Sequence, residues 1–141
     1  MAYDAGYNAV IPYTDIALGD IAGLTQDVIF SRGPKGVRRS GIFISGRAPI
    51  AAYDMLAAAR KAMVPPFDVS VFADPSGAFT TSAAMLACAE NVLRKAHGAE
   101  WSGRKVLVMS GSGPVGSTVA VLAAQAGANV TLVGHDGVES S

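Results

Sequence analysis

The sequence predicts an α/β protein in which parallel sheets are flanked by helices. Half of its 141 residues are hydrophobic, and 11 basic residues balance 11 acidic ones, as expected for one globular unit or part of one. Short β-like runs alternate along the chain with longer helical stretches. Because a helix between two strands makes a crossover connection, this alternation favours parallel strands with helices on the faces of the sheet.

Strands are expected where short runs of β-branched and other apolar residues lie between turn residues. The clearest segments are Gly41–Ser45, Val69–Ala73, Lys105–Met109 and Asn129–Val133, and a weaker one is Asn8–Tyr13. No internal repeat or low-complexity tract interrupts the alternation. The strand segments therefore set the framework on which the helices and loops are placed.

Helices are expected where apolar residues recur at a spacing of three or four. The expected segments are Ile16–Leu24, Ile50–Met63, Thr81–Ala96 and Pro114–Ala126. Thr14 is expected to cap the first and Pro49 to open the second, whereas Asp27–Ser31 is too short to assign.

Two of these helices have a recognisable apolar side. Ile50, Tyr53 and Leu56 fall on one face of the second helix. In the third helix Cys88 shares a side with Met85 and is expected to lie in the core. His97, near the end of that helix, is expected only to interact favourably with the helix C-terminus.

Composition excludes several classes of function. Cys88 is the single cysteine, so the chain has no internal disulfide and no multi-thiolate metal site, which favours a reducing compartment. No apolar run is long enough to cross a bilayer, and the balanced charge argues against nucleic-acid binding. We therefore expect a cytoplasmic protein with no membrane or nucleic-acid partner. A basic loop remains open to two interpretations, a solvated turn or a contact for an anionic tail, and its cations are Arg32, Lys35, Arg38 and Arg39.

A glycine-rich turn carries the strongest motif. Gly111-Ser-Gly113-Pro-Val-Gly116 follows one expected strand and opens the helix that leads to the next. In a dinucleotide-binding turn the first glycine permits the tight bend, the second admits the pyrophosphate and the third lets the helix pack closely. Free amides and the helix dipole then face the phosphates. The alternative is a glycine-rich turn that binds nothing.

The segment after the last expected strand bears on the choice of cofactor. An acidic residue there hydrogen-bonds the adenosine ribose of NAD, whereas a basic group accepts the 2′-phosphate of NADP. His135 and Asp136 occupy this place, so both cofactors stay open, and a surface loop with no cofactor role is the alternative.

The polar loop Asp74–Thr81 follows the carboxyl end of a strand, where α/β sheets bind ligands. Asp74, Thr80 and Thr81 are therefore candidate substrate contacts, although either threonine is equally suited to cap the following helix. Hydrolase and metalloprotease motifs are absent from the sequence, and Ser112 is better explained as a phosphate contact than as a nucleophile. No catalytic acid, base or nucleophile and no metal ligand is expected.

Several collinear segments resemble the bacterial NAD(P)-dependent methylene-tetrahydromethanopterin dehydrogenases, which oxidise a pterin-bound one-carbon unit in methylotrophs. The segments are Tyr3-Asp-Ala-Gly-Tyr, Ile11-Pro-Tyr-Thr, Leu24-Thr-Gln-Asp, Ile29-Phe-Ser-Arg, Gly41-Ile-Phe-Ile, Val64-Pro-Pro-Phe, Val71-Phe-Ala-Asp-Pro-Ser-Gly-Ala-Phe-Thr-Thr, the glycine-rich turn and Leu132-Val-Gly-His-Asp-Gly. They cover nearly all of the chain. Family members are roughly twice as long, so the resemblance implies a fragment that lacks an N-terminal strand and the rest of the cofactor domain.

The resemblance implies an oxidoreductase that transfers a hydride from methylene-tetrahydromethanopterin to NAD or NADP during formaldehyde oxidation. Residues 1–100 would form an α/β pterin-side domain, and residues 101–141 would begin an incomplete Rossmann domain, with the boundary at Gly98–Gly103. Thr80 would contact the pterin, with Thr81 and Gln26 as further substrate contacts. The cofactor-binding residues would be Gly111, Ser112, Gly113, Pro114, Val115, Gly116, His135 and Asp136.

The implied chemistry suits the lack of a catalytic group. Removing a hydride from a carbon between two nitrogens leaves a cation that the substrate itself stabilises, so catalysis would depend on positioning. Alternatives are a methylene-tetrahydrofolate dehydrogenase, although the sequence has no Tyr-x-x-x-Lys arrangement, and an inactive nucleotide-binding or oligomerisation fragment. A homo-oligomer that takes a small pterin substrate is the expected assembly.

Overall fold

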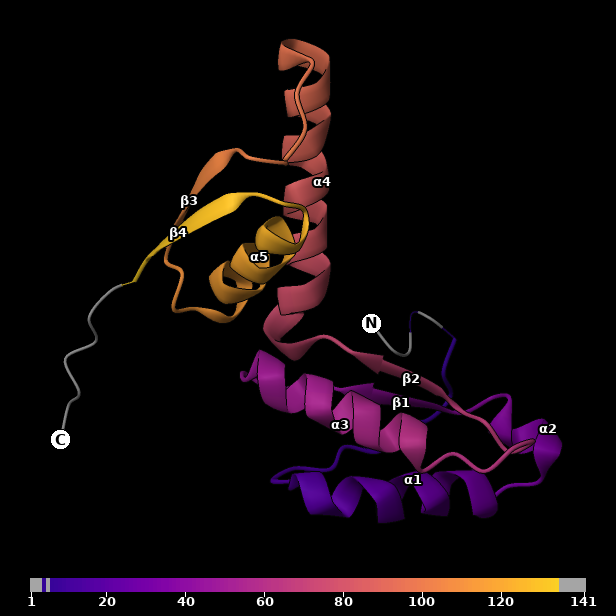
Figure 1. Cartoon of the computed structure of the whole chain (residues 1–141). Coiled ribbons are helices and arrows are strands. Elements are labelled where there is room, and N and C mark those ends of the chain that lie inside the picture. Colours follow the sequence, from indigo (N-terminus) through magenta and orange to yellow (C-terminus); the bar gives the residue numbers. More distant parts are fainter. Residues whose placement is uncertain (1–3, 5, 135–141) are drawn as a thin grey trace, which may run out of the picture.

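The computed structural model describes residue 4 and residues 6–134 of the chain. It is an α/β structure with two small parallel sheets and flanking helices (Figure 1). In chain order the elements are η1 (Leu18–Asp20), α1 (Ile21–Phe30), α2 (Pro34–Val37), β1 (Gly41–Ile44), α3 (Pro49–Lys61), β2 (Ser70–Ala73), η2 (Pro75–Gly77), α4 (Ala78–His97), β3 (Lys105–Met109), α5 (Pro114–Gln125) and β4 (Asn129–Val133).

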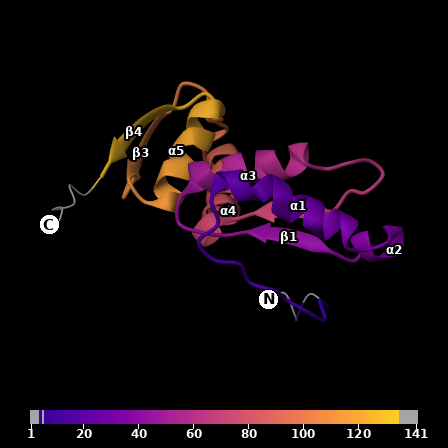
Figure 2. The same cartoon turned by 90° about the horizontal axis from the view of Figure 1, so that it is seen from below.

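The first sheet pairs β1 with β2 in parallel, from Gly41 opposite Ser70 to Ile44 opposite Ala73. Figure 2 shows α1 and α3 on the same side of this sheet. Two clusters of buried side chains fill the space between the helices and the strands, and they consist of Ile29, Val37 and Val69 and of Ile44, Ala52 and Ala73. Burial of these apolar side chains is the main force that holds the helices on the sheet.

The opposite face of the first sheet is apolar and largely open. Phe43 and Phe72 lie side by side there with their ring centroids 5.7 Å apart, and each is more than half exposed. The hydroxyl of Tyr7 lies against Gly41 on the same face, so the N-terminal segment crosses one end of it. The first sheet is thus packed by helices on one face only.

The second sheet is a β3–α5–β4 unit with parallel strands in register from Lys105 opposite Asn129 to Met109 opposite Val133. Val108, Val119 and Ala120 form its buried core, and Leu86 of α4 packs against them. Leu107 and Met109 project from the outer face and are 60% and 68% exposed. This sheet, too, is therefore covered on one face only.

The long helix α4 joins the two sheets. It starts just beyond the carboxyl end of β2, and α5 packs along it (Figure 1). Gly98 ends the helix in the left-handed conformation at φ 56°, and its amide donates to the carbonyl of Arg94. Because one helix serves both sheets, the loops at their carboxyl ends are brought into one region.

The structure confirms the α/β class and the strands expected at Gly41–Ser45, Val69–Ala73, Lys105–Met109 and Asn129–Val133, with ends that differ by one residue at most. The weak strand expected over Asn8–Tyr13 is wrong, because that segment is extended without pairing to either sheet.

The first helix was predicted too early in the chain. Thr14 caps nothing, and the helical segment starts at Leu18 and runs on through the stretch that the pattern could not assign. The threonine of this region that does form a hydrogen bond is Thr25. It is buried within α1, and its hydroxyl donates to the Ile21 carbonyl at 2.8 Å.

The expected apolar faces of α3 and α4 match the buried faces only in part, because Leu56 of α3 packs against the core whereas most of the other expected residues do not. In α3 the buried residues are Ala52 and Ala59, whereas Ile50 is 79% exposed and Tyr53 is 64% exposed. Cys88 is exposed on α4, so its assignment to the core is wrong. In α3 the buried positions are alanines, which let the helix approach its neighbours closely, and Met55 and Leu56 fill the space beside them.

None of the helices in the described part of the chain is long and apolar enough to cross a membrane.

Ile29 anchors the helix layer under the first sheet, and its side chain is fully buried. Ile29→Ala should lower the free energy of unfolding by about 2–5 kcal/mol, because it removes methyl groups and leaves a cavity. Urea unfolding monitored by circular dichroism measures the change. Ile50→Ala is the matched control, since that isoleucine is exposed on α3, and it should be close to neutral. Equal effects of the two substitutions would contradict the core assignment.

Candidate functional site

The glycine-rich turn joins β3 to α5 through a tight bend. Ser110 adopts the left-handed conformation at φ 59°, and its carbonyl accepts the amide of Gly113 at 3.1 Å. The amide of Gly111 donates to the carbonyl of Val133 at 2.9 Å, which ties the bend to the end of β4. A non-glycine residue in this conformation is strained, and such strain is concentrated at functional sites.

The three positions of the turn are occupied by glycine for different structural reasons. A side chain on Gly111 would collide with Leu132, and one on Gly116 would collide with the Ser110 carbonyl. These two glycines are therefore required by the packing of α5 on the strands. Gly113 has ordinary backbone angles, φ −78° and ψ 163°, and a Cβ there would make only a normal contact at 3.5 Å. The protein's own packing does not explain Gly113.

The turn presents unused donors. Within the described chain, the amides of Ser112, Val115 and Gly116 have no acceptor. They lie at the start of α5, where the helix dipole favours negative charge. The hydroxyls of Ser117 and Thr118 instead donate back to the Pro114 carbonyl. Chemically, this turn fits a phosphate or pyrophosphate group.

Asp74 organises the second loop. Its carboxylate accepts the amides of Phe79 and Thr80 at 2.9 and 3.2 Å and the hydroxyl of Thr80 at 2.6 Å. Asp74 thereby caps α4 from outside the helix, across the left-handed residues Ser76 and Gly77. The prediction that Thr80 or Thr81 caps the helix is wrong, because both residues lie inside α4, which begins at Ala78.

The hydrogen bonds of Asp74 change its acidity. Partial burial raises the pKa of the carboxyl, but the bonds from the Thr80 hydroxyl and from the Thr80 and Phe79 amides outweigh this and hold the pKa below its usual value. The carboxylate is therefore ionised at neutral pH and fully occupied by donors of its own chain.

Thr80 and Thr81 lie on an exposed side of α4. They line a shallow depression whose other walls are Ala84, Met85 and Cys88. The hydroxyl of Thr80 donates its proton to Asp74, so its oxygen is left with the capacity to accept a further hydrogen bond. Both threonines thus remain accessible from solvent at the start of the helix.

A buried contact connects the two loops. Ser82 has no exposed surface, and its hydroxyl donates to the carbonyl of Val115 at 3.0 Å. The first turn of α4 therefore lies against the first turn of α5, and η2 contacts α5 as well. Sequence reasoning missed Ser82, because a serine directly after two threonines carries no sign that it faces a neighbouring helix.

The remaining predicted residues lie elsewhere. Gln26 is exposed in the middle of α1, which packs against α3. His135 and Asp136 lie outside the described residues. Gly134, which precedes them, lies beside the side chain of Ser112 in the glycine-rich turn. No cluster of metal-ligating side chains occurs among residue 4 and residues 6–134.

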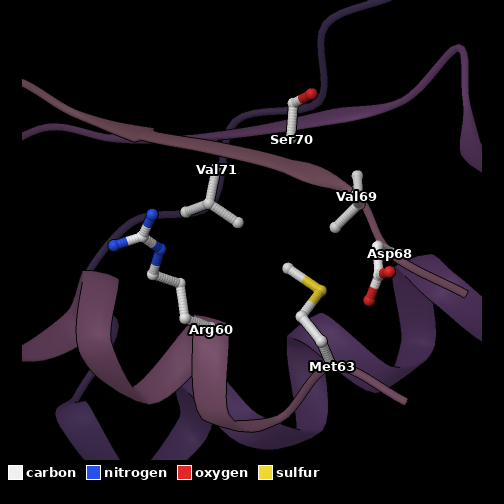
Figure 3. A pocket seen from close by; sticks show the side chains of 6 residues that line it. All are labelled: Arg60, Met63, Asp68, Val69, Ser70 and Val71. Carbon is white, nitrogen blue, oxygen red and sulfur yellow. The ribbon is translucent and has the colours of Figure 1, made fainter. Parts of the chain in front are cut away.

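A second hollow lies at the opposite end of the first sheet. Figure 3 shows Arg60 and Asp68 at its two sides with Met63 between them. It opens beside the start of β2, whereas Asp74 and the glycine-rich turn lie beyond the ends of the strands. Ligands of open parallel sheets bind at the carboxyl ends of the strands, so the candidate site is the region of the two loops.

Fold and site together define an α/β protein in which a strand–turn–helix unit with a glycine-rich turn is set against a second parallel sheet. The profile described as "Methylene-tetrahydromethanopterin dehydrogenase, N-terminal" matches residues 1–76, more than half of the chain. The chain belongs to this family.

Two relatives from Methylorubrum extorquens strain AM1 match almost the whole chain. A protein named NAD(P)-dependent methylenetetrahydromethanopterin dehydrogenase is 48% identical over 139 residues, which are 99% of this chain and 47% of the relative. A protein named Bifunctional protein MdtA is 33% identical over 135 residues, which are 96% of this chain and 46% of the relative. The chain thus spans about half the length of the relatives it matches.

Asp74 should contribute stability that depends on pH. Its pKa is lower in the folded state, so its contribution is present above the unfolded pKa of about 3.9 and is lost as pH falls through the folded value. Asp74→Ala should cost about 1–2 kcal/mol at neutral pH, with a smaller cost below about pH 4. Urea unfolding across this range measures it. Asp54→Ala, an exposed aspartate on α3, is the control, and a pH-independent cost at Asp74 would contradict the capping role.

Proposed function

We propose that the whole protein oxidises methylene-tetrahydromethanopterin, with NAD or NADP as the hydride acceptor, in one-carbon metabolism of the kind found in methylotrophs. Family membership and the printed name of the 48% identical relative support this activity. The chain described here would supply the pterin-side unit, residues 1–100, and the first part of a Rossmann domain, residues 101–141.

The observation that carries the proposal is that neither backbone conformation nor packing requires a glycine at position 113. Gly111 and Gly116 are explained by packing against Leu132 and Ser110, but a side chain at Gly113 would make only an ordinary contact with the Ser110 carbonyl. A glycine that the protein does not need is expected where a ligand approaches the backbone, as the pyrophosphate of a dinucleotide does. The unused amides beside it supply the donors such a group requires.

The two loops suit a reaction that needs positioning rather than acid or base. The Ser82–Val115 bond holds the start of α4 against the start of α5, so a carrier at Thr80 and a dinucleotide at the glycine-rich turn would share one region. Holding two reactants in line contributes about 7–11 kcal/mol in favourable cases. Gln26 and Thr81 are further proposed substrate contacts.

The proposed reaction requires little of the protein's ionisable groups. When bound, the nicotinamide takes up the hydride and both its electrons, and the remaining carbon is a cation shared by two nitrogens. No proton needs to move at the reacting carbon. Asp74, already occupied by three donors, orients Thr80 instead of acting as a base.

We infer that the protein works in the cytoplasm, where nicotinamide dinucleotides and one-carbon carriers are found, and that it forms a homo-oligomer. The chain exposes 9985 Å², against about 6,800 Å² expected for a compact protein of its mass. The open faces at Phe43 and Phe72 and at Leu107 and Met109 supply apolar surface that a second copy would cover. His135 and Asp136 are the residues proposed to choose between NAD and NADP.

The test is calorimetric titration of the 141-residue chain with NAD and NADP, followed by addition of methylene-tetrahydromethanopterin while nicotinamide absorbance is recorded. Gly113→Asp should abolish dinucleotide binding, since it places bulk and negative charge beside the pyrophosphate. Gln125→Glu adds the same charge at the far end of α5 and should leave binding intact. Retained affinity in the Gly113 variant would refute the phosphate-binding role.

A further inference from the structure

Charge is scarce at the carboxyl ends of the strands. In the described loops that follow β1, β2 and β3, Arg47 is the sole cation and Asp74 the sole acid. The charge of Asp74 is directed at Thr80 and Phe79 of its own chain. The electrostatic field that a ligand meets at this edge of the first sheet is therefore set by Arg47.

The backbone of the loop that contains Arg47 is hydrogen-bonded to the loop after β2, which leads into α4 and Thr80. The hydroxyl of Ser76 donates to the carbonyl of Gly46 at 2.8 Å, and the amide of Asp74 donates to the carbonyl of Ile44 at 3.0 Å. These bonds tie the loop after β1 to the loop after β2. Arg47 follows Gly46 directly, so its side chain starts beside the proposed substrate contacts.

Arg47 is also free to bind a ligand. Its side chain is exposed, and within the described residues no carboxylate pairs with it. A guanidinium group offers a planar fork of donors that matches a carboxylate or a phosphate with two parallel hydrogen bonds. Arg47 therefore has the position and the chemistry of an anion contact.

We propose that Arg47 binds the anionic tail of the one-carbon carrier. The inference rests on the proposed function, which places a pterin ring at Thr80. A carrier of this class consists of a reduced pterin ring joined to a long tail that ends in acidic groups. With the ring against Thr80, the tail extends over the loop that contains Arg47, and the charge of Arg47 is what favours a carrier over a bare pterin.

Other cations are on the wrong side of the sheet. Arg32, Lys35, Arg38 and Arg39 precede β1, and Arg60 lies by the start of β2, as Figure 3 shows. The strands of a parallel sheet all run in one direction, so these residues lie at the N-terminal ends of the strands, opposite the two loops. The basic loop noted in the sequence is therefore not the proposed anion contact.

The experiment compares the binding of ligands with and without a tail to the full-length protein that contains this chain. The probes are tetrahydromethanopterin, 6-methyltetrahydropterin, which has the ring but no anionic tail, and NADP. Arg47→Ala should weaken tetrahydromethanopterin binding by roughly fivefold or more and leave the tail-free ring unchanged. Arg47→Lys should restore part of the affinity, because the charge remains but the fork is lost. Raising the salt concentration should lower the affinity of the wild-type protein for tetrahydromethanopterin toward that of the alanine variant.

Arg60→Ala is the matched control, since it removes the same charge at the opposite edge and should change neither ligand. Equal weakening of both pterins by Arg47→Ala would overturn the proposal, because the role of Arg47 would then be structural. If Arg47→Ala weakened the binding of NADP alone, the anion that Arg47 contacts would belong to the dinucleotide, and the proposal would be overturned too. If the wild-type full-length protein binds neither pterin, the proposed function fails together with this inference. If both pterins bind and Arg47→Ala changes neither affinity, only this inference fails.

Discussion

The buried contact between the first turns of α4 and α5 is the constraint on which the arrangement of the site depends. The hydroxyl of the fully buried Ser82 donates to the Val115 carbonyl, so the N-terminal parts of the two helices lie side by side. Each helix begins beyond the carboxyl end of a strand, β2 for α4 and β3 for α5. One interhelical contact therefore converts two separate small sheets into a single region in which two ligands can meet.

Within this region the two loops use opposite designs. The glycine-rich turn leaves backbone amides unused, and only Gly111 and Gly116 of its glycines are explained by close packing, an arrangement that suits a diffuse negative charge. The Asp74 loop satisfies its only acid internally and turns a threonine oxygen outward. Under the proposed function, the first loop would bind phosphate through its backbone amides, and the second would contact a neutral ring through an oriented side chain. Neither depends on a group that changes its protonation near neutral pH.

The sequence predicts the strands, α3, α5 and the glycine-rich turn well, because proline and glycine mark their ends and the pattern between them is unambiguous. It places the start of α4 three residues too late, since the capping carboxylate of Asp74 lies several residues upstream across left-handed Ser76 and Gly77, which no local pattern describes. It fails at Cys88 and Ile50 for another reason. Periodicity shows that a helix has an apolar side, but which side is covered depends on what else packs against the helix.

The differing reasons for the three glycines bear on how the turn would change over generations. Gly111 and Gly116 are held by collisions with Leu132 and Ser110, so purifying selection on the fold alone keeps them. Gly113 has no such protection, because its neighbours leave room for a side chain. In a lineage that abandoned the cofactor, drift would reach Gly113 first, while its two companions persisted as a record of the turn.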